Sequence, residues 1–224
     1  MKHFSVQTIF VNDRPLSMAG MEFVATNSRA IDLIGTCASV DDFLTMLHDS
    51  SGEVAVIDYS IRGKDRMQGL ALLGYLQRTY SDLRIVSLVS HVNPVIIRSI
   101  LEQGVSAVVS KFDDVGHIIT AIHVSYGGGH YLSPVIKNTL CAAGEGNQKA
   151  RKLSPREIEV IRLYLSGLSI QKIAALLNKG KQTVSAQKIS AMRKLGAKND
   201  IDLIKSAAAL DLVDEADVTR AILS

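Results

Sequence analysis

The stretch TIFVNDRPLSMAG, residues 8–20, decides how the first half of the chain folds. An apolar run ends abruptly at Asn12 and Asp13, and a helical pattern begins at Pro15. In many α/β proteins, an apolar strand that ends in polar side chains marks a ligand site at the carboxyl edge of the sheet. The stretch therefore predicts a strand followed by a helix, with two oxygen-bearing side chains where such a site would lie.

Five short apolar runs alternate with five amphipathic runs up to residue 130. The apolar runs lie at residues 6–11, 31–36, 54–57, 85–89 and 105–109, and the helical patterns at 15–26, 41–48, 69–79, 94–103 and 113–126. This alternation predicts parallel βαβ units in a doubly wound α/β sheet. The apolar runs are rich in Val and Ile and contain few polar residues, as expected of strands that helices cover on both faces.

Polar side chains follow three of the expected strands. Asn12 and Asp13 end the first, Asp58 ends the third, and Lys111 follows the fifth. We expect them to converge, because the carboxyl ends of parallel strands lie at one edge. Carboxylate and amide oxygens suit Mg²⁺, and an ammonium suits a neighbouring anion. The cluster predicts that Asp58 can accept a phosphoryl group while Mg²⁺ and Lys111 neutralise the developing charge.

Positive charge is concentrated in the second half of the chain. The net charge is only +3, but residues 149–198 hold 12 Lys/Arg against 2 Asp/Glu, whereas residues 1–144 hold 11 against 13. Such a concentration predicts a polyanionic partner. The Gly-containing stretch CAAGEGNQKARK separates the two halves. We expect a first domain at residues 1–130, a helical extension and linker at 131–152, and a second domain at 153–224.

Composition excludes several classes of protein. The chain has 224 residues, of which 47% are hydrophobic, but no apolar run reaches the roughly 18 residues that span a bilayer. The amino end lacks the features of an export signal. Cys37, Cys141 and the six histidines show neither metal-ligand spacing nor a partnered nucleophile. We expect a cytoplasmic protein with reduced thiols, no membrane partner and no enzymatic activity beyond self-phosphorylation.

The second domain has a helical pattern from residue 153 onward. LSPREIEVIRLYLSG begins with Ser154 as N-cap and has Glu157 three residues later, which predicts a capping box. A short helix capped by Ser169 follows, then the turn KGKQ, the basic helix VSAQKISAMRKLG and a fourth helix in NDIDLIKSAAALDL. Two short helices joined by a four-residue turn are typical of a helix-turn-helix that binds double-stranded DNA. A basic helix that serves only as a solvated surface is the alternative.

The spacing of the basic helix separates an inner face from an outer one. Val184, Gln187, Ala191 and Leu195 recur at i, i+3, i+7 and i+11 and should pack inward. Outward small and apolar side chains can contact thymine methyl groups, and serine can bond base edges. Lysine and arginine contact phosphates, which position the protein without specifying sequence. The candidate DNA-binding residues are Lys179, Lys181, Thr183, Ser185, Ala186, Lys188, Ile189, Arg193 and Lys194.

Both domains resemble known families on these residues. The first resembles a response-regulator receiver, with Asp58 at the phosphoacceptor position, Asn12 and Asp13 at the acidic pair and Lys111 at the invariant lysine. This implies a flavodoxin-like fold, bound Mg²⁺ and phosphotransfer from a histidine kinase, a phosphotransfer protein or a small phosphodonor. Residues 153–212 resemble the LuxR-type helix-turn-helix of the NarL/FixJ regulators. That resemblance implies a homodimer, or a heterodimer with another regulator, in which the final helix is the usual contact on DNA.

The receiver departs from the family pattern where a phosphoryl group is coupled to a change of shape. Val89 stands where the family has a Thr or Ser that bonds the phosphoryl group, and Val108 stands where it has an aromatic switch residue. Arg62 replaces the usual proline, and Asn12 removes one negative charge. In the second domain Ile189 stands where the most similar helices tend to carry lysine, which leaves the identity of the DNA site open.

We expect a bacterial transcription regulator whose receiver acts as a dimerisation or docking module with weak or no dependence on phosphorylation. A conventional regulator that phosphorylation of Asp58 activates is the first alternative. An interaction protein that sequesters another regulator without binding DNA is the second. A receptor for acyl-homoserine lactones, which has the same helix-turn-helix, is disfavoured. Its aromatic ligand pocket would call for tryptophan, whereas this chain has none and begins with five βα units.

Overall fold

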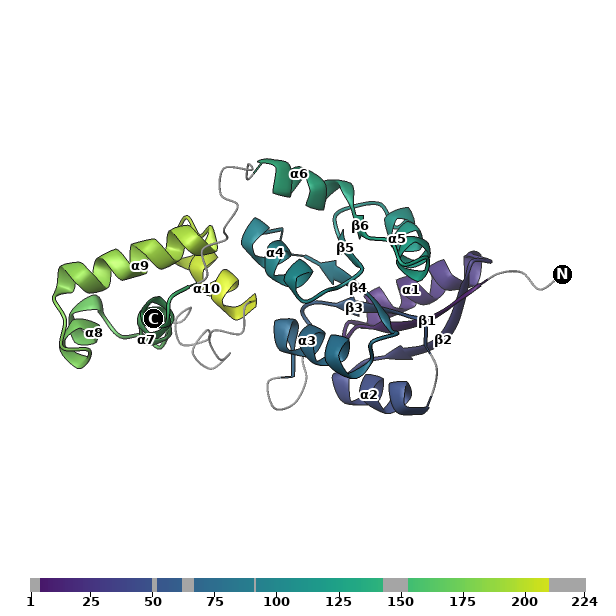
Figure 1. Cartoon of the computed structure of the whole chain (residues 1–224), viewed down its shortest axis with the longest axis horizontal. Helices are drawn as coiled ribbons and strands as arrows, with labels where there is room; N and C mark the ends of the chain where they lie inside the picture. Colours follow the sequence, from purple (N-terminus) through teal and green to yellow (C-terminus); the bar gives the residue numbers. More distant parts are fainter. Residues whose placement is uncertain (1–4, 50–51, 62–66, 91, 143–152, 210–224) are drawn as a thin grey trace. The chain divides into compact units, whose positions relative to one another are not determined.

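The structure, a computed structural model, describes residues 5–49, 52–61, 67–90, 92–142 and 153–209. The chain divides into two compact units, an α/β unit of residues 1–92 and 97–144 and a helical unit of residues 93–96 and 145–224 (Figure 1). Residues 143–152 of the expected helical extension and linker, Arg62 and the part of the fourth expected helix beyond residue 209 lie outside the described residues. None of the described helices is long and apolar enough to cross a bilayer.

The α/β unit is a six-stranded sheet flanked by six helices. All strand pairings are parallel, in the order β2-β1-β3-β4-β5-β6, which confirms the doubly wound fold expected from the sequence. The strands are β1 Val6–Val11, β2 Ile31–Cys37, β3 Val54–Asp58, β4 Arg84–Val89, β5 Ala107–Ser110 and β6 Tyr131–Leu132. The helices are α1 Pro15–Asn27, α2 Val40–Asp49, α3 Gly69–Thr79, α4 Pro94–Glu102, α5 Gly116–Tyr126 and α6 Pro134–Ala142.

The sheet has one strand more than the sequence pattern predicts. Tyr131 and Leu132 form β6, which pairs with β5, so residues expected to begin a helical extension belong to the sheet. Gly128, in the turn between α5 and β6, has a φ of 78°, a left-handed conformation that favours glycine. A strand of two residues is too short to show a periodicity, and its pairing with the sheet edge decides its conformation.

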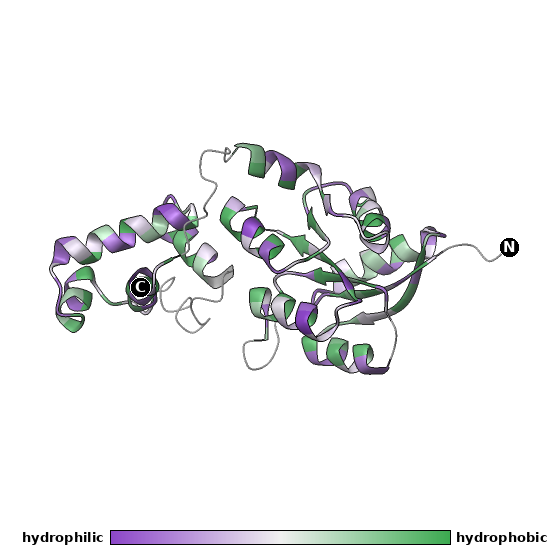
Figure 2. Ribbon diagram, in the orientation of Figure 1, coloured by the Kyte–Doolittle hydropathy of each residue, from purple (hydrophilic) through white to green (hydrophobic). Residues whose placement is uncertain are grey.

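Helices cover both faces of the sheet, which explains why the strands are apolar along their whole length. On one face Phe10 and Val56 pack in a core cluster with Met21 of α1 and Ile122 of α5. The alternate strand residues, among them Ile57, are also fully buried. Figure 2 shows the strands mostly in the colour of hydrophobic residues, whereas the helices carry both kinds. This burial on both faces confirms the expectation from the Val/Ile runs.

The helical unit consists of α7 Pro155–Leu165, α8 Ile170–Leu176, α9 Lys181–Leu195 and α10 Asp200–Ala209. The capping box of α7 is present, because the hydroxyl of Ser154 accepts from the Glu157 N–H and the Glu157 carboxylate accepts from the Ser154 N–H. Ser169 caps α8 by accepting from the backbone N–H of Lys172. Two clusters of buried side chains hold α7 against α8, α9 and α10.

The helix α9 begins at Lys181, three residues earlier than the start at Val184 expected from the sequence. Gly180 is its N-cap, and Lys181 and Gln182 belong to its first turn rather than to the connecting turn. The N–H groups of Thr183 and Val184 both donate to the Gly180 carbonyl, which extends the helix back to this point. This start adds Gln182 to the helix surface.

Candidate phosphoacceptor site and candidate nucleic-acid interface

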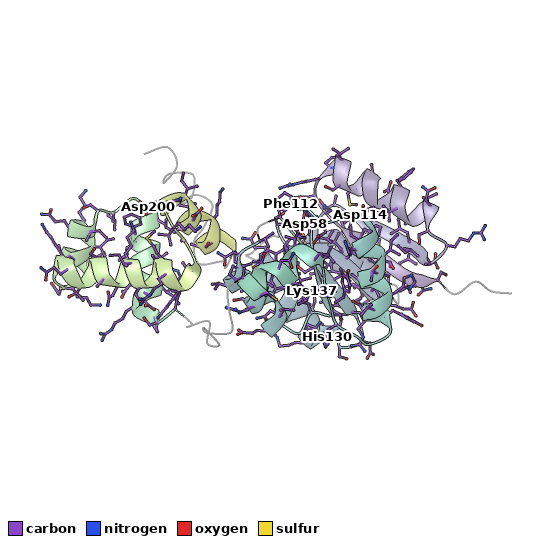
Figure 3. All side chains as sticks on the ribbon, turned by 90° about the horizontal axis from the view of Figure 1, so that it is seen from above. Asp58, Phe112, Asp114, His130, Lys137 and Asp200 are labelled. Atoms are coloured by element: carbon purple, nitrogen blue, oxygen red, sulfur yellow. The ribbon has the colours of Figure 1, made fainter. Side chains whose placement is uncertain are left out.

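Asp58, labelled in Figure 3, lies at the end of β3. It is completely buried, and hydrogen bonds engage both of its carboxylate oxygens. Lys111 donates from Nζ to Oδ2 and forms an ion pair with it. Ser60 donates to Oδ1 from its backbone N–H at 3.1 Å and from its hydroxyl at 2.8 Å. A buried carboxylate is costly unless such partners compensate for lost water. The structure thus brings Asp58 and Lys111 together, as expected from the strand ends.

Ser60 is a member of the site that was not predicted from the sequence. It lies two residues after Asp58, and a backbone N–H two residues after an Asp commonly donates to that carboxylate in a turn. The spacing in the segment Asp58-Tyr59-Ser60 is therefore the signal that could have identified it.

Asn12 and Asp13 directly follow β1 but lie in different environments. Asn12 is fully buried, whereas Asp13 is exposed. The Arg14 N–H donates to Asn12 Oδ1 at 2.9 Å, and Nδ2 has no hydrogen-bond partner among the described residues. Because an N–H can donate only to the oxygen, this bond defines how the amide is oriented. The free end of Asn12 is therefore a hydrogen-bond donor.

The residues at this edge fit a Mg²⁺ ion only in part. The carboxylates of Asp13 and Asp58 are the ligand type that Mg²⁺ prefers, and the exposure of Asp13 leaves room for water ligands. The free Nδ2 of Asn12 cannot ligate a cation. Among the described residues, no group of three His, Cys, Asp or Glu side chains is arranged to hold a metal. Asp13 and Asp58 are therefore the carboxylates at this edge that would serve as Mg²⁺ ligands.

The two valines that depart from the receiver pattern are buried at the same sheet edge. Val89 is 1% exposed and pairs with Ser110 of β5, and Val108 is fully buried in that strand. Neither side chain can form a hydrogen bond. The acceptor site consequently lacks the hydroxyl and the aromatic ring that the receiver pattern places at these positions.

The inward face of α9 packs as predicted. Val184, Ala191 and Leu195 are at most 1% exposed, and Gln187 is partly buried among them. This face holds the helix on the scaffold formed by α7, α8 and α10. It therefore decides which side chains remain on the opposite surface.

The opposite face of α9 is a stripe of four exposed side chains, which we call the outer stripe. Gln182, Ala186, Ile189 and Arg193 recur at i, i+4, i+7 and i+11, and Ile189 is 61% exposed. Ala186, Ile189 and Arg193 were predicted from the sequence, whereas Gln182 was missed because the helix was expected to begin later. Lys181 and Thr183 are exposed at the helix start, while Lys179 and Ser185 are half-buried.

Lys188, expected to face DNA, is instead engaged within the helical unit. Its Nζ lies 2.7 Å from Asp200 Oδ1 and 3.7 Å from the centre of the Tyr164 ring, and the Tyr164 hydroxyl donates to Asp200. Burial lowers the pKa of Lys188, but its bonds with Asp200 and Tyr164 outweigh this and raise it. The bond from Lys188 likewise lowers the pKa of Asp200, labelled in Figure 3. The ammonium is thus committed to an internal contact.

Lys194, also expected at a phosphate, pairs with the buried carboxylate of Glu157. The Lys194 ammonium donates to Oε2 at 2.6 Å, and the Ser190 hydroxyl donates to Oε1 at 2.8 Å. Burial raises the pKa of Glu157, but the hydrogen bonds from Lys194, Ser154 and Ser190 outweigh it and lower the pKa to about 2. Two of the nine candidate residues therefore have their charge neutralised inside the unit, which their position in the sequence does not reveal.

Comparisons with known proteins agree with both halves of this description. Residues 151–207 match the family of bacterial regulatory proteins of the luxR type. The transcriptional regulatory protein RcsB of Escherichia coli K12 is 26% identical over 208 residues, which cover 93% of this chain and 96% of RcsB. The response regulator UvrY of the same organism is 21% identical over 202 residues, covering 88% of this chain and 91% of UvrY.

Solved structures of RcsB resemble the chain as well. Salmonella enterica serovar Typhimurium RcsB bound to the promoter P1flhDC with the phosphomimetic BeF₃⁻ has a TM-score of 0.80 at 26% identity, over 92% of this chain and 99% of that one. An RcsB–DNA complex has a TM-score of 0.77 at 26% identity, over 92% and 98%. Residues 151–207 are therefore a LuxR-family helix-turn-helix domain that follows a receiver-like α/β domain in the sequence, in a chain similar to the RcsB response regulators of the NarL/FixJ family.

Proposed function

We propose that the chain is a bacterial transcription regulator that binds double-stranded DNA through the outer stripe of α9. The observation that carries the proposal is that α9 has two opposite faces. One face is buried against the other helices of the unit, and the other presents the exposed outer stripe. The complexes of RcsB with DNA support it, because they share the fold of both domains. Such a regulator would act in the cytoplasm, where the bacterial chromosome lies.

The chemistry of the outer stripe favours A·T base pairs. Gln182 has the amide that can bond both N6 and N7 of adenine, and Ala186 and Ile189 present apolar surface to thymine methyl groups. Lys181 and Arg193 are exposed at the two ends of the helix, where their charges suit phosphates. The N-terminus of α9 adds backbone N–H groups that attract the same anions.

Binding to DNA is tested with duplexes selected from a random-sequence library, measured at several salt concentrations. We expect Lys181→Ala and Arg193→Ala each to weaken binding about 3- to 10-fold on all duplexes and to reduce the salt slope by about one. Arg29→Ala, which removes one exposed charge from the α/β unit, is the matched control and should change neither. Lys188→Ala should leave the salt slope unchanged because its ammonium is already paired.

Sequence recognition is tested separately with Ile189→Ala. We expect it to relax discrimination at one thymine by about 1 kcal/mol and to leave the salt slope unaltered. If none of these variants weakens binding, or if no duplex is selected, the chain does not recognise DNA. An interaction protein that sequesters another regulator would then be the supported function.

We further propose that the receiver-like unit acts mainly as a dimerisation or docking module. Its acceptor carboxylate is buried with both oxygens bonded, and Val89 and Val108 provide no hydrogen bond to report a phosphoryl group. In the helical unit, Ile201 is 63% exposed on α10, the helix that the family resemblance implies as the contact with a second copy or another regulator. Phosphorylation of Asp58 by a histidine kinase or phosphotransfer protein, with Mg²⁺, remains the alternative.

Beryllofluoride with Mg²⁺ mimics a phosphoryl group on a carboxylate. It therefore distinguishes a dimerisation or docking module from a receiver that phosphorylation of Asp58 controls. DNA affinity and molecular mass are measured for the wild type and for Asp58→Asn, which can still accept hydrogen bonds from Ser60. We expect both quantities to change less than twofold on adding beryllofluoride. An increase in affinity of about tenfold in the wild type that is absent from Asp58→Asn would instead establish control by phosphorylation.

A further inference from the structure

The outer stripe of α9 combines an exposed apolar side chain with positive charge. Ile189 is 61% exposed within the stripe, and Arg193 is exposed at its end. In the part of the helical unit that the structure describes, neither Arg193 nor the exposed Lys181 forms an ion pair. This surface therefore suits a partner in which carboxylates and apolar side chains lie next to one another.

The chain itself contains a segment of that composition shortly after α10. Residues 211–217, DLVDEAD, hold four carboxylates and no Lys or Arg, and we call them the acidic segment. Leu212 and Val213 lie between the first carboxylate and the other three. These residues lie outside the described part of the chain. Because residues 149–198 hold 12 Lys/Arg against 2 Asp/Glu, the acidic segment has the opposite charge to the surface of α9.

The acidic segment is long enough to reach the outer stripe. The helix α10 packs in one buried cluster with the carboxyl-terminal half of α9 and ends at Ala209. The eight residues from there to Asp217 can span at most about 26 to 29 Å. A helix with its side chains is about 10 to 12 Å across, so half its circumference is about 17 Å. The segment can therefore pass round α9 to Ile189 and Arg193 on the outer face.

We propose that the acidic segment binds the outer stripe of its own helical unit and competes there with DNA. Leu212 and Val213 cover Ile189, and the neighbouring carboxylates pair with Arg193. This inference rests on the proposed DNA-binding function, because it adds a regulation of the same surface. Since the segment belongs to the same chain, it meets the stripe at an effective concentration on the order of millimolar, at which weak contacts compete with DNA.

Two variants of the full chain distinguish a direct contact from an effect of charge. The serine variant replaces only Leu212 and Val213, each by serine, and keeps every charge. The amide variant neutralises the acidic segment with Asp211→Asn, Asp214→Asn, Glu215→Gln and Asp217→Asn. Without DNA, we expect both variants to shift the NMR backbone amide signals of Ile189 and Arg193 relative to the wild type. The signal of Ala174, buried in the cluster around α8, is the internal reference and should not move.

Affinity for a selected duplex measures the competition. If the segment covers the stripe about nine-tenths of the time, the apparent affinity is about tenfold below that of the free stripe. We expect the amide variant to bind about tenfold more tightly than the wild type at low salt and the serine variant about threefold, with smaller gains as the salt concentration rises. The matched control neutralises four exposed carboxylates of the α/β unit and should change the affinity less than about twofold. Its substitutions are Asp32→Asn, Asp49→Asn, Asp82→Asn and Glu102→Gln.

Three results would overturn the proposal. The first is unchanged signals of Ile189 and Arg193 in both variants, which would show that the segment does not contact the stripe. The second is tighter DNA binding by the amide variant without any gain in the serine variant, which would reduce the segment to a long-range repulsion of DNA. The third is a set of shifts that depends on protein concentration, which would place the segment on a second copy. Failure of every form to bind a duplex would contradict the proposed DNA-binding function, whereas the NMR comparison would still decide the contact.

Discussion

Replacing Glu157 by Gln removes the charge that holds the start of α7 to the end of α9. Its carboxylate accepts from the Ser154 N–H at 2.7 Å, the Ser190 hydroxyl at 2.8 Å and the Lys194 ammonium at 2.6 Å. A neutral amide keeps the shape but offers one acceptor oxygen instead of two. The NH₂ group can donate to the Ser190 hydroxyl, but the amide oxygen left for the Ser154 N–H and the Lys194 ammonium carries no charge, so the variant should be less stable.

The pKa of Glu157 sets the size of the loss. It falls from 4.5 to about 2 in the folded chain, and at about 1.36 kcal/mol per pKa unit the ionised form stabilises the fold by roughly 3 kcal/mol. Because the folded pKa is below the unfolded one, this stabilisation is complete above about pH 5 and is lost as the pH falls towards 2. We expect Glu157→Gln to cost about 2 to 3 kcal/mol at pH 7, clearly less at pH 3 and almost nothing near pH 2.

Urea titrations at pH 7, 4.5 and 3 measure the free energy of unfolding, followed by the NMR amide signals of Ala191 and Leu203. These buried residues report on the helical unit separately from the α/β unit. Glu159→Gln, an exposed position in the same helix, is the control and should change stability by less than about 0.5 kcal/mol. A cost below 0.5 kcal/mol for Glu157→Gln, or the same cost at pH 7 and pH 3, would refute the role of the charge.

Two further predictions concern thiols and glycines. Burial, and then the charge of Asp42, raise the pKa of Cys37 to about 11, so at pH 8 a thiol reagent should modify exposed Cys141 about 100-fold faster. Equal rates of the two thiols, measured by peptide mass spectrometry, would contradict this. Gly167 has a φ of 89°, so Gly167→Ala should destabilise the helical unit by about 1 kcal/mol, whereas Gly20→Ala within α1 should stabilise the α/β unit by about 0.5 to 1 kcal/mol. Urea titration should show a lower free energy of unfolding for Gly167→Ala and a higher one for Gly20→Ala. A change in the same direction in both variants would contradict the explanation from backbone conformation.

Much of the fold could be predicted because local patterns carry the information. The apolar runs and helical patterns locate the first five strands and five helices within a few residues, and the capping box of Ser154 and Glu157 marks the start of α7. The contact between Asp58 and Lys111, 53 residues apart, followed from one topological rule, since parallel strands bring their carboxyl ends to the same edge. Such features depend on periodicity and chain direction alone.

Other features depend on which groups meet in space. The strand β6 exists because β5 offers a free edge, and neither of its residues shows a pattern of its own. Long side chains such as Lys188 and Lys194 can point to solvent or inward, and only the positions of Asp200 and Glu157 decide between these directions.

The sequence alone thus determined the two domains, the converging strand ends and the inward face of α9. Burial produces a periodic pattern of apolar residues, and the common direction of parallel strands brings their carboxyl ends to one edge. Only the tertiary structure decided the availability of individual groups. It paired Lys188 with Asp200 and Lys194 with Glu157, and it added Gln182 to the outer stripe. Among the described residues it left Asn12 Nδ2 without a hydrogen-bond partner. The reason is physical: pairing and desolvation depend on neighbours that are distant in the sequence.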